Sequence, residues 1–172
     1  GTILNRNFNF CELVNKINGP LESFQDYMES LKGTYNLIYI DEGKMLIARD
    51  PYGIKPMCFG KLQDTFIAVS ESCALDAMNG EFLQDVEPGT IVLVENGDYS
   101  VHHFSKKPHH LCLFEMIYIA RHDSVIDGVS VYQARYKTGE RLYEECPTDG
   151  DIVIGSPDSG LIAAKGYAKA SG

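Results

Sequence analysis

The stretch with the clearest capacity for chemistry is Asp158-Ser159-Gly160, which follows an apolar run at residues 152–154 and precedes a run rich in alanine and glycine. This order predicts a strand, a tight turn and a helix. The start of such a helix presents free backbone N–H groups and the positive end of the helix dipole, which together attract anions. Magnesium takes oxygen ligands and often shares them with substrate phosphates. The alternative is that Ser159 or Asp158 only caps the helix.

A second polar stretch, "RDPYGIKP" at residues 49–56, combines charge with turn-forming residues. Arg49, Asp50 and Gly53 could contact a substrate. The same residue types are typical of a tight, hydrogen-bonded connection between two strands. We favour the connection, because it accounts for these residues without a ligand.

The spacing of the cysteines and histidines does not indicate a metal site by itself. Cys112 lies in an apolar segment, where a lone cysteine is usually a small buried residue, and Cys58 and Cys73 are expected to be buried as well. The adjacent histidines at 102–103 and 109–110 would point to opposite faces of a strand, so we expect solvated side chains. No two cysteines have C-x-x-C spacing; they stand at positions 11, 58, 73, 112 and 146.

Composition narrows the class of protein. The 172 residues suffice for one ordinary domain or two small ones. With 15 basic and 24 acidic residues the net charge is −9, which argues against a nucleic-acid partner. The sequence has no apolar run long enough to span a membrane and no secretory leader pattern at its start. Together with an odd number of widely spaced cysteines, these features predict a cytoplasmic protein without a membrane partner.

The elements that would position these residues change in type along the chain. Apolar residues at helical spacing predict helices at 10–17 and 21–32, separated by Asn18-Gly19-Pro20 and stopped by Gly33. One short helix is expected at 70–78, with Ser70 or Ser72 as its cap. Alternating apolar residues between turn signals predict an antiparallel sheet with strands at 34–40, 44–49, 55–61, 65–70, 90–97 and 99–104.

The pattern after residue 110 is different. The polar, proline-bearing stretch at 105–110 predicts a linker, and an amphipathic helix is expected at 130–146. A buried-type strand at 151–156 and a small-residue helix after it then suggest close helix–sheet packing. Helix, apolar strand, tight turn and helix in this order are typical of an α/β unit with a parallel sheet.

Four stretches taken together resemble the glutamine phosphoribosylpyrophosphate amidotransferase family. A single stretch could belong to another glutamine amidotransferase, but their order is specific. The resemblance implies an α+β glutaminase portion of the N-terminal-nucleophile hydrolase type (glutamine amidotransferase type 2) over residues 1–105. The start of an α/β type I phosphoribosyltransferase domain would follow over residues 106–172. The matching stretches are residues 33–61, 67–94, 112–142 and 157–172.

The resemblance also implies an activity. The intact enzyme would be a glutamine-dependent glycosyltransferase that hydrolyses glutamine and passes the ammonia to phosphoribosylpyrophosphate. The product would be 5-phosphoribosylamine, in the first step of de novo purine synthesis. The same resemblance implies a homotetramer in the cytoplasm with purine nucleotides as feedback inhibitors.

Two cofactor sites are implied by the same family. Ser159 matches a serine that contacts magnesium, and Ser159 and Gly160 would bind the phosphate of the substrate. Cys112 matches the first of four cysteines that hold a [4Fe-4S] cluster, and thiolate ligation suits such a cluster. The other three ligands would lie beyond residue 172.

A further segment is implied to couple the two active sites. It comprises Tyr118, Arg121, Asp123 and Ser124 of "YIARHDS", in which His122 stands where the family has proline. From the residues alone, the alternative is a loop with an ordinary Arg–Asp surface pair, which contributes little to stability.

The sequence departs from the family at its start. The family uses an N-terminal cysteine whose own α-amine serves as base, in a Cys-Gly start that is absent here. We therefore expect an incomplete chain without a catalytic residue and inactive by itself. Phe10 stands where an aspartate of the glutamine site is expected. The alternative function is a non-catalytic fragment or paralogue that keeps the scaffold and binds a nucleotide or a protein partner.

Overall fold

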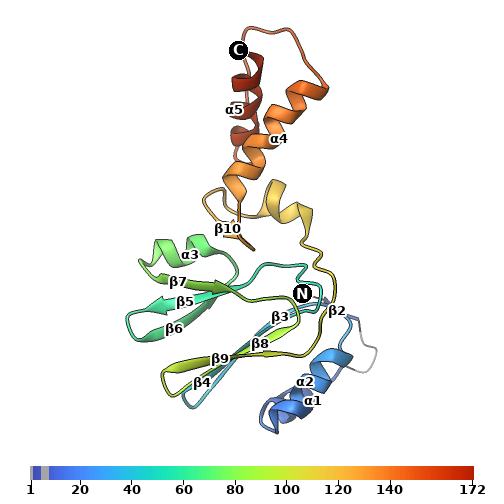
Figure 1. The fold of residues 1–172 in the computed structure, drawn as a ribbon, viewed down its shortest axis with the longest axis vertical. Helices are drawn as coiled ribbons and strands as arrows, with labels where there is room; N and C mark the ends of the chain where they lie inside the picture. The colour runs from blue at the N-terminus through green and yellow to red at the C-terminus, as the bar shows by residue number, and fades with distance from the viewer. Residues whose placement is uncertain (1, 5–7) are drawn as a thin grey trace.

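The computed structural model describes residues 2–4 and 8–172 of the chain. The molecule is elongated, with two sheets at one end and a pair of helices at the other (Figure 1). The helices are α1 (Phe10–Ile17), α2 (Leu21–Ser30), α3 (Ser72–Ala77), the π-helix η1 (Glu115–Ile119), α4 (Val131–Glu145) and α5 (Gly160–Ser171). No helix in the described part of the chain is long and apolar enough to cross a bilayer.

The strands form two larger antiparallel sheets and two short pairs. The four-stranded sheet has the order β3-β4-β8-β9 and the three-stranded sheet the order β6-β5-β7, while β1 pairs with β2 and β10 with β11. All pairings are antiparallel, as the sequence predicts for residues 34–104. The strands are β1 (Thr2–Ile3), β2 (Gly33–Thr34), β3 (Asn36–Asp41), β4 (Lys44–Arg49), β5 (Cys58–Leu62), β6 (Thr65–Val69), β7 (Glu81–Asp85), β8 (Thr90–Glu95), β9 (Asp98–His103), β10 (Val125–Ile126) and β11 (Val129–Ser130).

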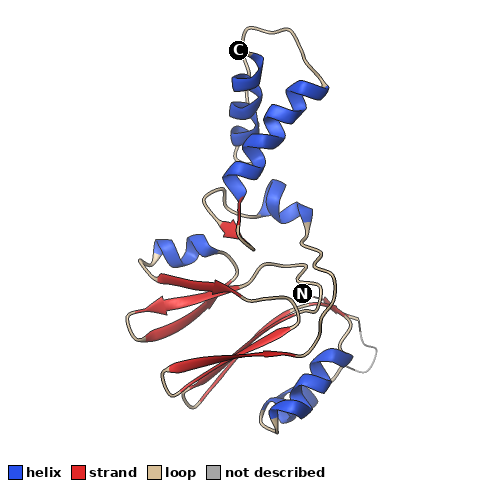
Figure 2. Ribbon diagram, viewed as in Figure 1, coloured by secondary structure: helices blue, strands red, loops and turns tan. Residues whose placement is uncertain are grey.

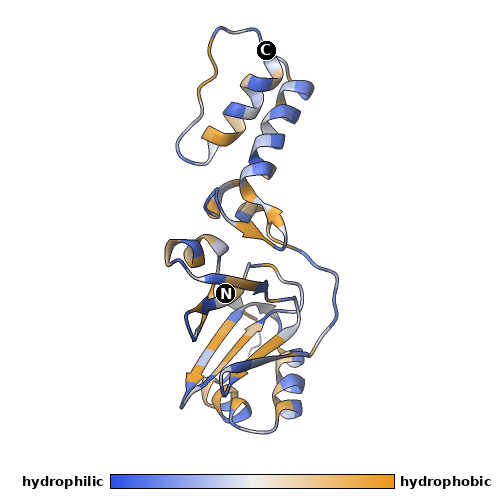
Figure 3. Ribbon diagram, turned by 60° about the vertical axis from the view of Figure 1, so that its left-hand side comes forward, coloured by the Kyte–Doolittle hydropathy of each residue, from blue (hydrophilic) through white to orange (hydrophobic). Residues whose placement is uncertain are grey.

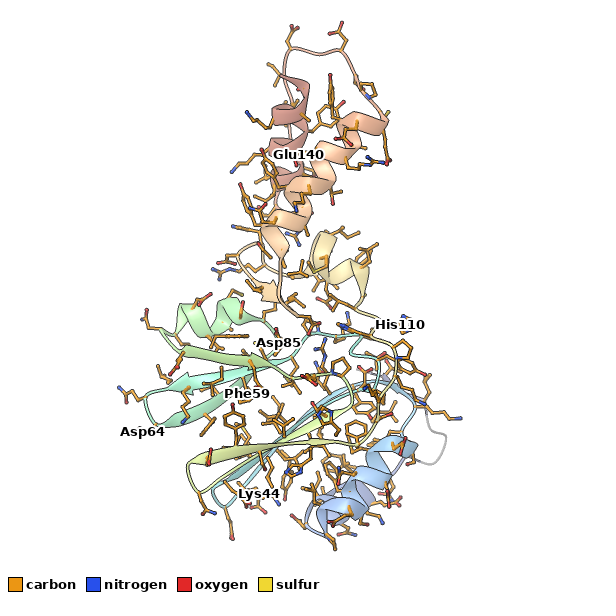
Figure 4. All side chains as sticks on the ribbon, viewed as in Figure 1. Lys44, Phe59, Asp64, Asp85, His110 and Glu140 are labelled. Carbon is orange, nitrogen blue, oxygen red and sulfur yellow. The ribbon has the colours of Figure 1, made fainter. Side chains whose placement is uncertain are left out.

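Strand β4 lies at the centre of the core because both of its faces are covered. Leu46 and Ala48 pack with the apolar faces of α1 and α2, whereas Met45 and Ile47 pack with residues of the three-stranded sheet. Phe59 of that sheet is fully buried and points into the space between the two sheets (Figure 4). Residues at successive positions point to opposite faces, so an almost uninterrupted apolar strand is the expected sequence of a doubly covered one.

Most elements predicted for the first 104 residues are confirmed, and the differences have local causes. Helix α1 begins at Phe10 because the Asn9 side chain accepts a hydrogen bond from the Cys11 amide at 2.9 Å. Helix α2 ends at Ser30 rather than at residue 32, and Gly33 belongs to β2. Strand β7 was not predicted, since its apolar residues are adjacent rather than alternating and its pairing with β5 contains an irregularity.

Helix α4 and helix α5 pack directly against each other, apart from the sheets (Figure 2). A Cβ atom added to Gly139 would overlap the carbonyl oxygen of Ala163, and one added to Gly166 would overlap that of Tyr136. The small residues of α5 therefore allow two helix backbones to approach. The sequence predicted helix–sheet packing for these residues, which is wrong in the described structure.

The strand predicted at 151–156 is absent from the structure as well. The segment carries no strand, and Ile152 and Ile154 are 79% and 86% exposed. A β-strand requires a neighbouring backbone to hydrogen-bond with, and no element within residues 2–4 and 8–172 pairs with this segment. The parallel sheet of an α/β domain is therefore not present in the described residues.

Candidate functional site

A hollow of about 520 Å³ lies between two parts of the chain that are far apart in the sequence. One wall is formed by residues 118–122, and the other by Asp158, Ser159 and the first turn of α5. Arg135 of α4 contributes the floor between them. The structure thus brings Tyr118 and Arg121 to the same cavity as Ser159, although almost forty positions separate them in the sequence.

Ser159 occupies the N-terminal cap position of α5 but does not cap it. Its backbone is already helical, with φ −67° and ψ −34°, and its side chain makes no capping hydrogen bond. The simple capping interpretation of Ser159 is therefore not supported. Two backbone amides at this helix start are engaged, since Gly160 N donates to Ser156 O at 2.9 Å and Leu161 N to Asp158 O at 3.4 Å. Fewer free N–H groups face a ligand than the sequence suggested.

Arg121 and Asp123 form the surface ion pair that the residues alone predict. The guanidinium donates from Nε and Nη2 to the two carboxylate oxygens at 2.8 and 2.6 Å. Both side chains are exposed. The hydrogen bond from Arg121 lowers the pKa of the Asp123 carboxyl, so this aspartate stays ionised over a wider pH range.

The same segment is tied to the start of α3, which sequence reasoning missed. Glu71 Oε2 accepts hydrogen bonds from the Arg121 amide and from Ser124 Oγ, each at 2.8 Å. Ser72 Oγ accepts one from the Val125 amide at 2.8 Å. The predicted capping role of Ser72 or Ser70 is wrong: Glu71 is the cap residue of α3, and no side chain caps the helix.

Arg135 is a further residue that sequence reasoning did not single out. Its side chain is 5% exposed and donates from Nε to Met116 O at 2.8 Å and from Nη2 to Ala120 O at 2.7 Å. It thereby holds the backbone of η1 and the turn after it. Burial lowers the pKa of Arg135, while the charge of Glu71 raises it. The available signal was its place on the helical face between Val131 and Gly139, where an arginine is unusual.

Arg49 confirms the predicted strand connection but extends beyond it. Its guanidinium is fully buried and donates to the carbonyls of Lys55, Gly53 and Val86. It also binds both carboxylate oxygens of Asp127 at 2.7 and 2.9 Å. Asp127 lies at the first position of the tight β10–β11 turn, with φ 48°. A buried ion pair thus joins the sheets to the segment beyond the predicted linker.

The predicted linker is irregular in structure, and two of its residues contact other parts of the chain. The His109 ring lies 3.3 Å from the second carboxylate oxygen of Asp127, and the His110 amide donates to Tyr52 O. His110 lies at the junction between the sheets and the rest of the molecule (Figure 4). The side chains of His103, His109 and His110 are exposed, as expected, although the chain doubles back here on the 49–54 connection.

Comparisons with known proteins agree with this architecture. Residues 9–77 match a family model described as a glutamine amidotransferase domain. The chain is 44% identical to an amidophosphoribosyltransferase of Archaeoglobus fulgidus over 145 residues, which is 84% of this chain and 32% of that protein. It is 39% identical to one of Pyrococcus horikoshii, over 95% of this chain and 36% of that protein. The chain spans about a third of the length of these curated relatives.

Two solved structures give the same result at the level of the fold. One is glutamine phosphoribosylpyrophosphate amidotransferase from B. subtilis complexed with ADP and GMP, with a TM-score of 0.85 and 32% identity, over 99% of this chain and 39% of that one. The other is described as the allosteric regulatory enzyme of purine biosynthesis, with a TM-score of 0.84 and 33% identity, over 92% of this chain and 36% of that one. The chain is similar to amidophosphoribosyltransferases over most of its length.

The similarity to a glutamine amidotransferase domain concerns the sheet half of the chain. The family model begins at Asn9, the cap of α1, and ends in α3. It therefore covers helices α1 to α3, strands β2 to β6 and the 49–56 connection. Phe10, which the resemblance puts in place of an aspartate, is the first residue of α1 and is 66% exposed. The predicted division into residues 1–105 and 106–172 stays a prediction.

The amidophosphoribosyltransferase resemblance also implies Cys112 and Ser159 as metal ligands, and both roles stay predictions. Cys112 is half-buried and unpaired, and its amide donates to Ile54 O. No three His, Cys, Asp or Glu side chains within residues 2–4 and 8–172 are placed to hold a metal ion together. Cys112 could contribute one ligand to a cluster, and a complete set is not present among these residues.

Proposed function

We propose that the polypeptide containing this sequence hydrolyses glutamine and uses the ammonia to aminate phosphoribosylpyrophosphate. Water and glutamine give glutamate and ammonia. The nitrogen lone pair then forms a bond to the anomeric carbon, and the bond to the pyrophosphate oxygen breaks. The products are 5-phosphoribosylamine and pyrophosphate, the opening step of purine synthesis. The observation that carries the proposal is the hollow that places Tyr118 and Arg121 opposite Ser159, in a chain whose residues 9–77 match a glutamine amidotransferase model.

Ser159 and Gly160 are proposed to receive the phosphates of the substrate. The Ser159 hydroxyl makes no capping bond, and a Cβ atom on Gly160 would have only an ordinary contact, to Ser156 Cβ at 3.6 Å. Packing therefore does not explain a glycine at position 160, whereas close approach of a phosphate would. Magnesium, when bound, would neutralise phosphate charge there, and the Ser159 hydroxyl is an oxygen ligand of the kind it prefers.

Cys112 is proposed as one ligand of a [4Fe-4S] cluster, with the remaining ligands outside the described residues. A half-buried thiol is accessible enough to be a ligand and protected enough to keep one. We attach no step of the reaction to this cluster, because the residues present do not complete it.

The resemblance and the structural neighbours also support proposals for regulation, assembly and location. A structural neighbour was solved with ADP and GMP, and we propose purine nucleotides as feedback inhibitors here too. We also propose a homo-oligomer, as the resemblance implies, in the cytoplasm. All five cysteines are unpaired, as expected in a reducing compartment.

The test uses the purified full-length polypeptide with glutamine, phosphoribosylpyrophosphate and magnesium. We expect release of glutamate and of pyrophosphate, each dependent on its own substrate. Ser159→Ala should lower kcat/KM for phosphoribosylpyrophosphate by roughly ten- to a hundredfold, as expected for a lost hydrogen bond to a charged group. Ser156→Ala in the same loop is the matched control. A wild-type polypeptide that releases neither product would overturn the proposal and favour the non-catalytic scaffold.

A further inference from the structure

Glu71 connects the sheet half of the molecule to the segment that lines the hollow. Helix α3 lies beside the β10–β11 hairpin, on the side of the sheets that faces the rest of the chain (Figure 1). From the start of this helix, Oε2 of Glu71 accepts hydrogen bonds from the Arg121 amide and from Ser124 Oγ, and the Cys73 thiol lies 3.9 Å from the same oxygen. Bonds to an ionised acceptor are the strong ones in proteins.

The contact continues on both sides of Glu71. Ser72 Oγ accepts the Val125 amide, so two consecutive residues of the sheet half bind the segment from 121 to 125. Ser124 is fully buried, and its carbonyl accepts the Val131 amide at the start of α4. The Glu71 side chain accepts no backbone amide of its own helix, although it occupies the cap position; from α3 it receives only the weak Cys73 thiol contact at 3.9 Å. Its carboxylate therefore serves the neighbouring segment instead of capping.

The other side of that segment faces the candidate site. Arg121 and His122 line the hollow together with Asp158 and Ser159. Arg135 fixes the preceding backbone through the carbonyls of Met116 and Ala120. The wall of the hollow is thus held by Arg135 from α4 and by Glu71 from the sheet half, and a displacement of this wall must alter the bonds at Glu71.

We propose that Glu71 is a positioning residue that couples the glutaminase half to the phosphoribosylpyrophosphate site by fixing residues 121–124. The inference rests on the proposed function and adds a residue outside the segment to which coupling was first assigned. Glu71 lines no part of the hollow, so its role is exerted through Arg121 and Ser124.

The experiment compares Glu71→Ala and Glu71→Gln with Glu95→Gln in the full-length polypeptide. Glu95 is an exposed glutamate at the end of β8 and serves as the matched control. The first readout is hydrogen exchange of the peptide covering residues 118–126. Glu71→Ala should exchange there roughly tenfold faster than wild type, because the acceptor of the Arg121 amide is lost. Glu71→Gln keeps an oxygen acceptor, so its exchange rate at 118–126 should lie between those of wild type and Glu71→Ala. The exchange rate of the peptide covering β4 should not change in any of the variants.

The second readout is the ratio of glutamate to pyrophosphate released. Wild type should release equal amounts, because each ammonia is used once. Glu71→Ala should raise this ratio roughly fivefold, the lower end of typical coupling between sites. Pyrophosphate release driven by added ammonium salt should fall less than the release driven by glutamine, since that reaction needs the hollow but not the glutaminase half. A purely structural defect would lower both rates and leave the ratio unchanged.

The outcomes separate this inference from the proposed function. A wild-type ratio in Glu71→Ala, or unchanged exchange at 118–126, overturns the role of Glu71 while the wild-type activity still supports the proposed function. A wild-type polypeptide without phosphoribosylpyrophosphate-dependent release overturns the proposed function and the coupling with it. If Glu71→Ala does not fold, Ser124→Ala and Glu71→Gln provide the same comparison, since each removes one part of the contact.

Discussion

The two ends of this molecule are held together in different ways. The sheet end buries large side chains on both faces of β4, with aromatic and aliphatic residues from two helices and a second sheet around it. The α4–α5 end has few buried apolar residues, and its helices meet through backbone contact at Gly139 and Gly166. Hydropathy shows part of the same contrast, with hydrophobic residues along the strands and mostly polar ones on α4 (Figure 3). A core of large side chains is destabilised when a mutation removes buried atoms. A contact between two backbones is destabilised when a mutation adds an atom between them.

The largest expected effect comes from removing volume at the sheet end. Phe59→Ala should lower the free energy of unfolding by about 4 kcal/mol, because it deletes a fully buried ring between the sheets. Phe82→Ala on β7, where the ring is 42% exposed, is the matched control and should have a small effect. Urea denaturation measures both. Equal losses from the two variants would contradict a core centred on Phe59.

The next effect concerns the connection between the two ends. Arg49→Met should cost about 3 kcal/mol, because it leaves the Asp127 carboxylate and three buried carbonyls without their donor. Arg141→Met is the control, since its ion pairs with Glu144 and Glu145 lie at the surface and should matter little. Thermal unfolding followed by circular dichroism compares them. An Arg49→Met variant as stable as Arg141→Met would mean that the Arg49–Asp127 ion pair does not hold the two ends together.

Adding a methyl group to α5 tests the backbone contact directly. Gly166→Ala should destabilise the α4–α5 pair by about 2 kcal/mol, because the new Cβ overlaps the Tyr136 carbonyl. Gly160→Ala in the same helix has room for its Cβ and should stabilise the helix by about 0.5 kcal/mol through higher helix propensity. Hydrogen exchange of α4 and α5 measures both. Stabilisation by both variants would show that helix propensity, and not the close approach, dominates at this end.

The smallest effect is a contrast in pH dependence between two aspartates. Burial raises the pKa of Asp50 above its ordinary value of 3.8, so its contribution to stability is full below that value and is lost as pH rises through the raised pKa. The pKa of Asp123 is lowered by Arg121, so its small contribution is present above 3.8 and is lost as pH falls through the lowered pKa.

Asp50→Asn and Asp123→Asn reveal this difference in denaturation curves taken between acidic and neutral pH. The stability of Asp50→Asn relative to wild type should rise with pH, and that of Asp123→Asn should fall. Parallel pH profiles for the two variants would contradict the difference in burial between these carboxyls.

Much of the sheet end could be predicted from residue patterns, because its determinants are local. Alternating apolar residues between turn signals located β3, β4, β8 and β9, and helical spacing with Asn18-Gly19-Pro20 located α1 and α2. Strand β7 was not predicted, because its apolar residues do not alternate. The strand predicted at 151–156 failed for the opposite reason: its residues suit a strand, but pairing depends on a neighbour that the pattern of one segment cannot supply.

The candidate site shows the same division. Residue types alone indicated that Ser159 could do chemistry, whereas only a family resemblance suggested a role for Arg121. That they share a hollow, and that Glu71 and Arg135 hold its wall, follows from contacts between residues some 15 to 50 positions apart. The sequence by itself determined the local elements, because helical and strand periodicity are properties of short stretches. Only the tertiary structure decided which polar groups meet, because a hydrogen bond between distant segments depends on how whole elements pack.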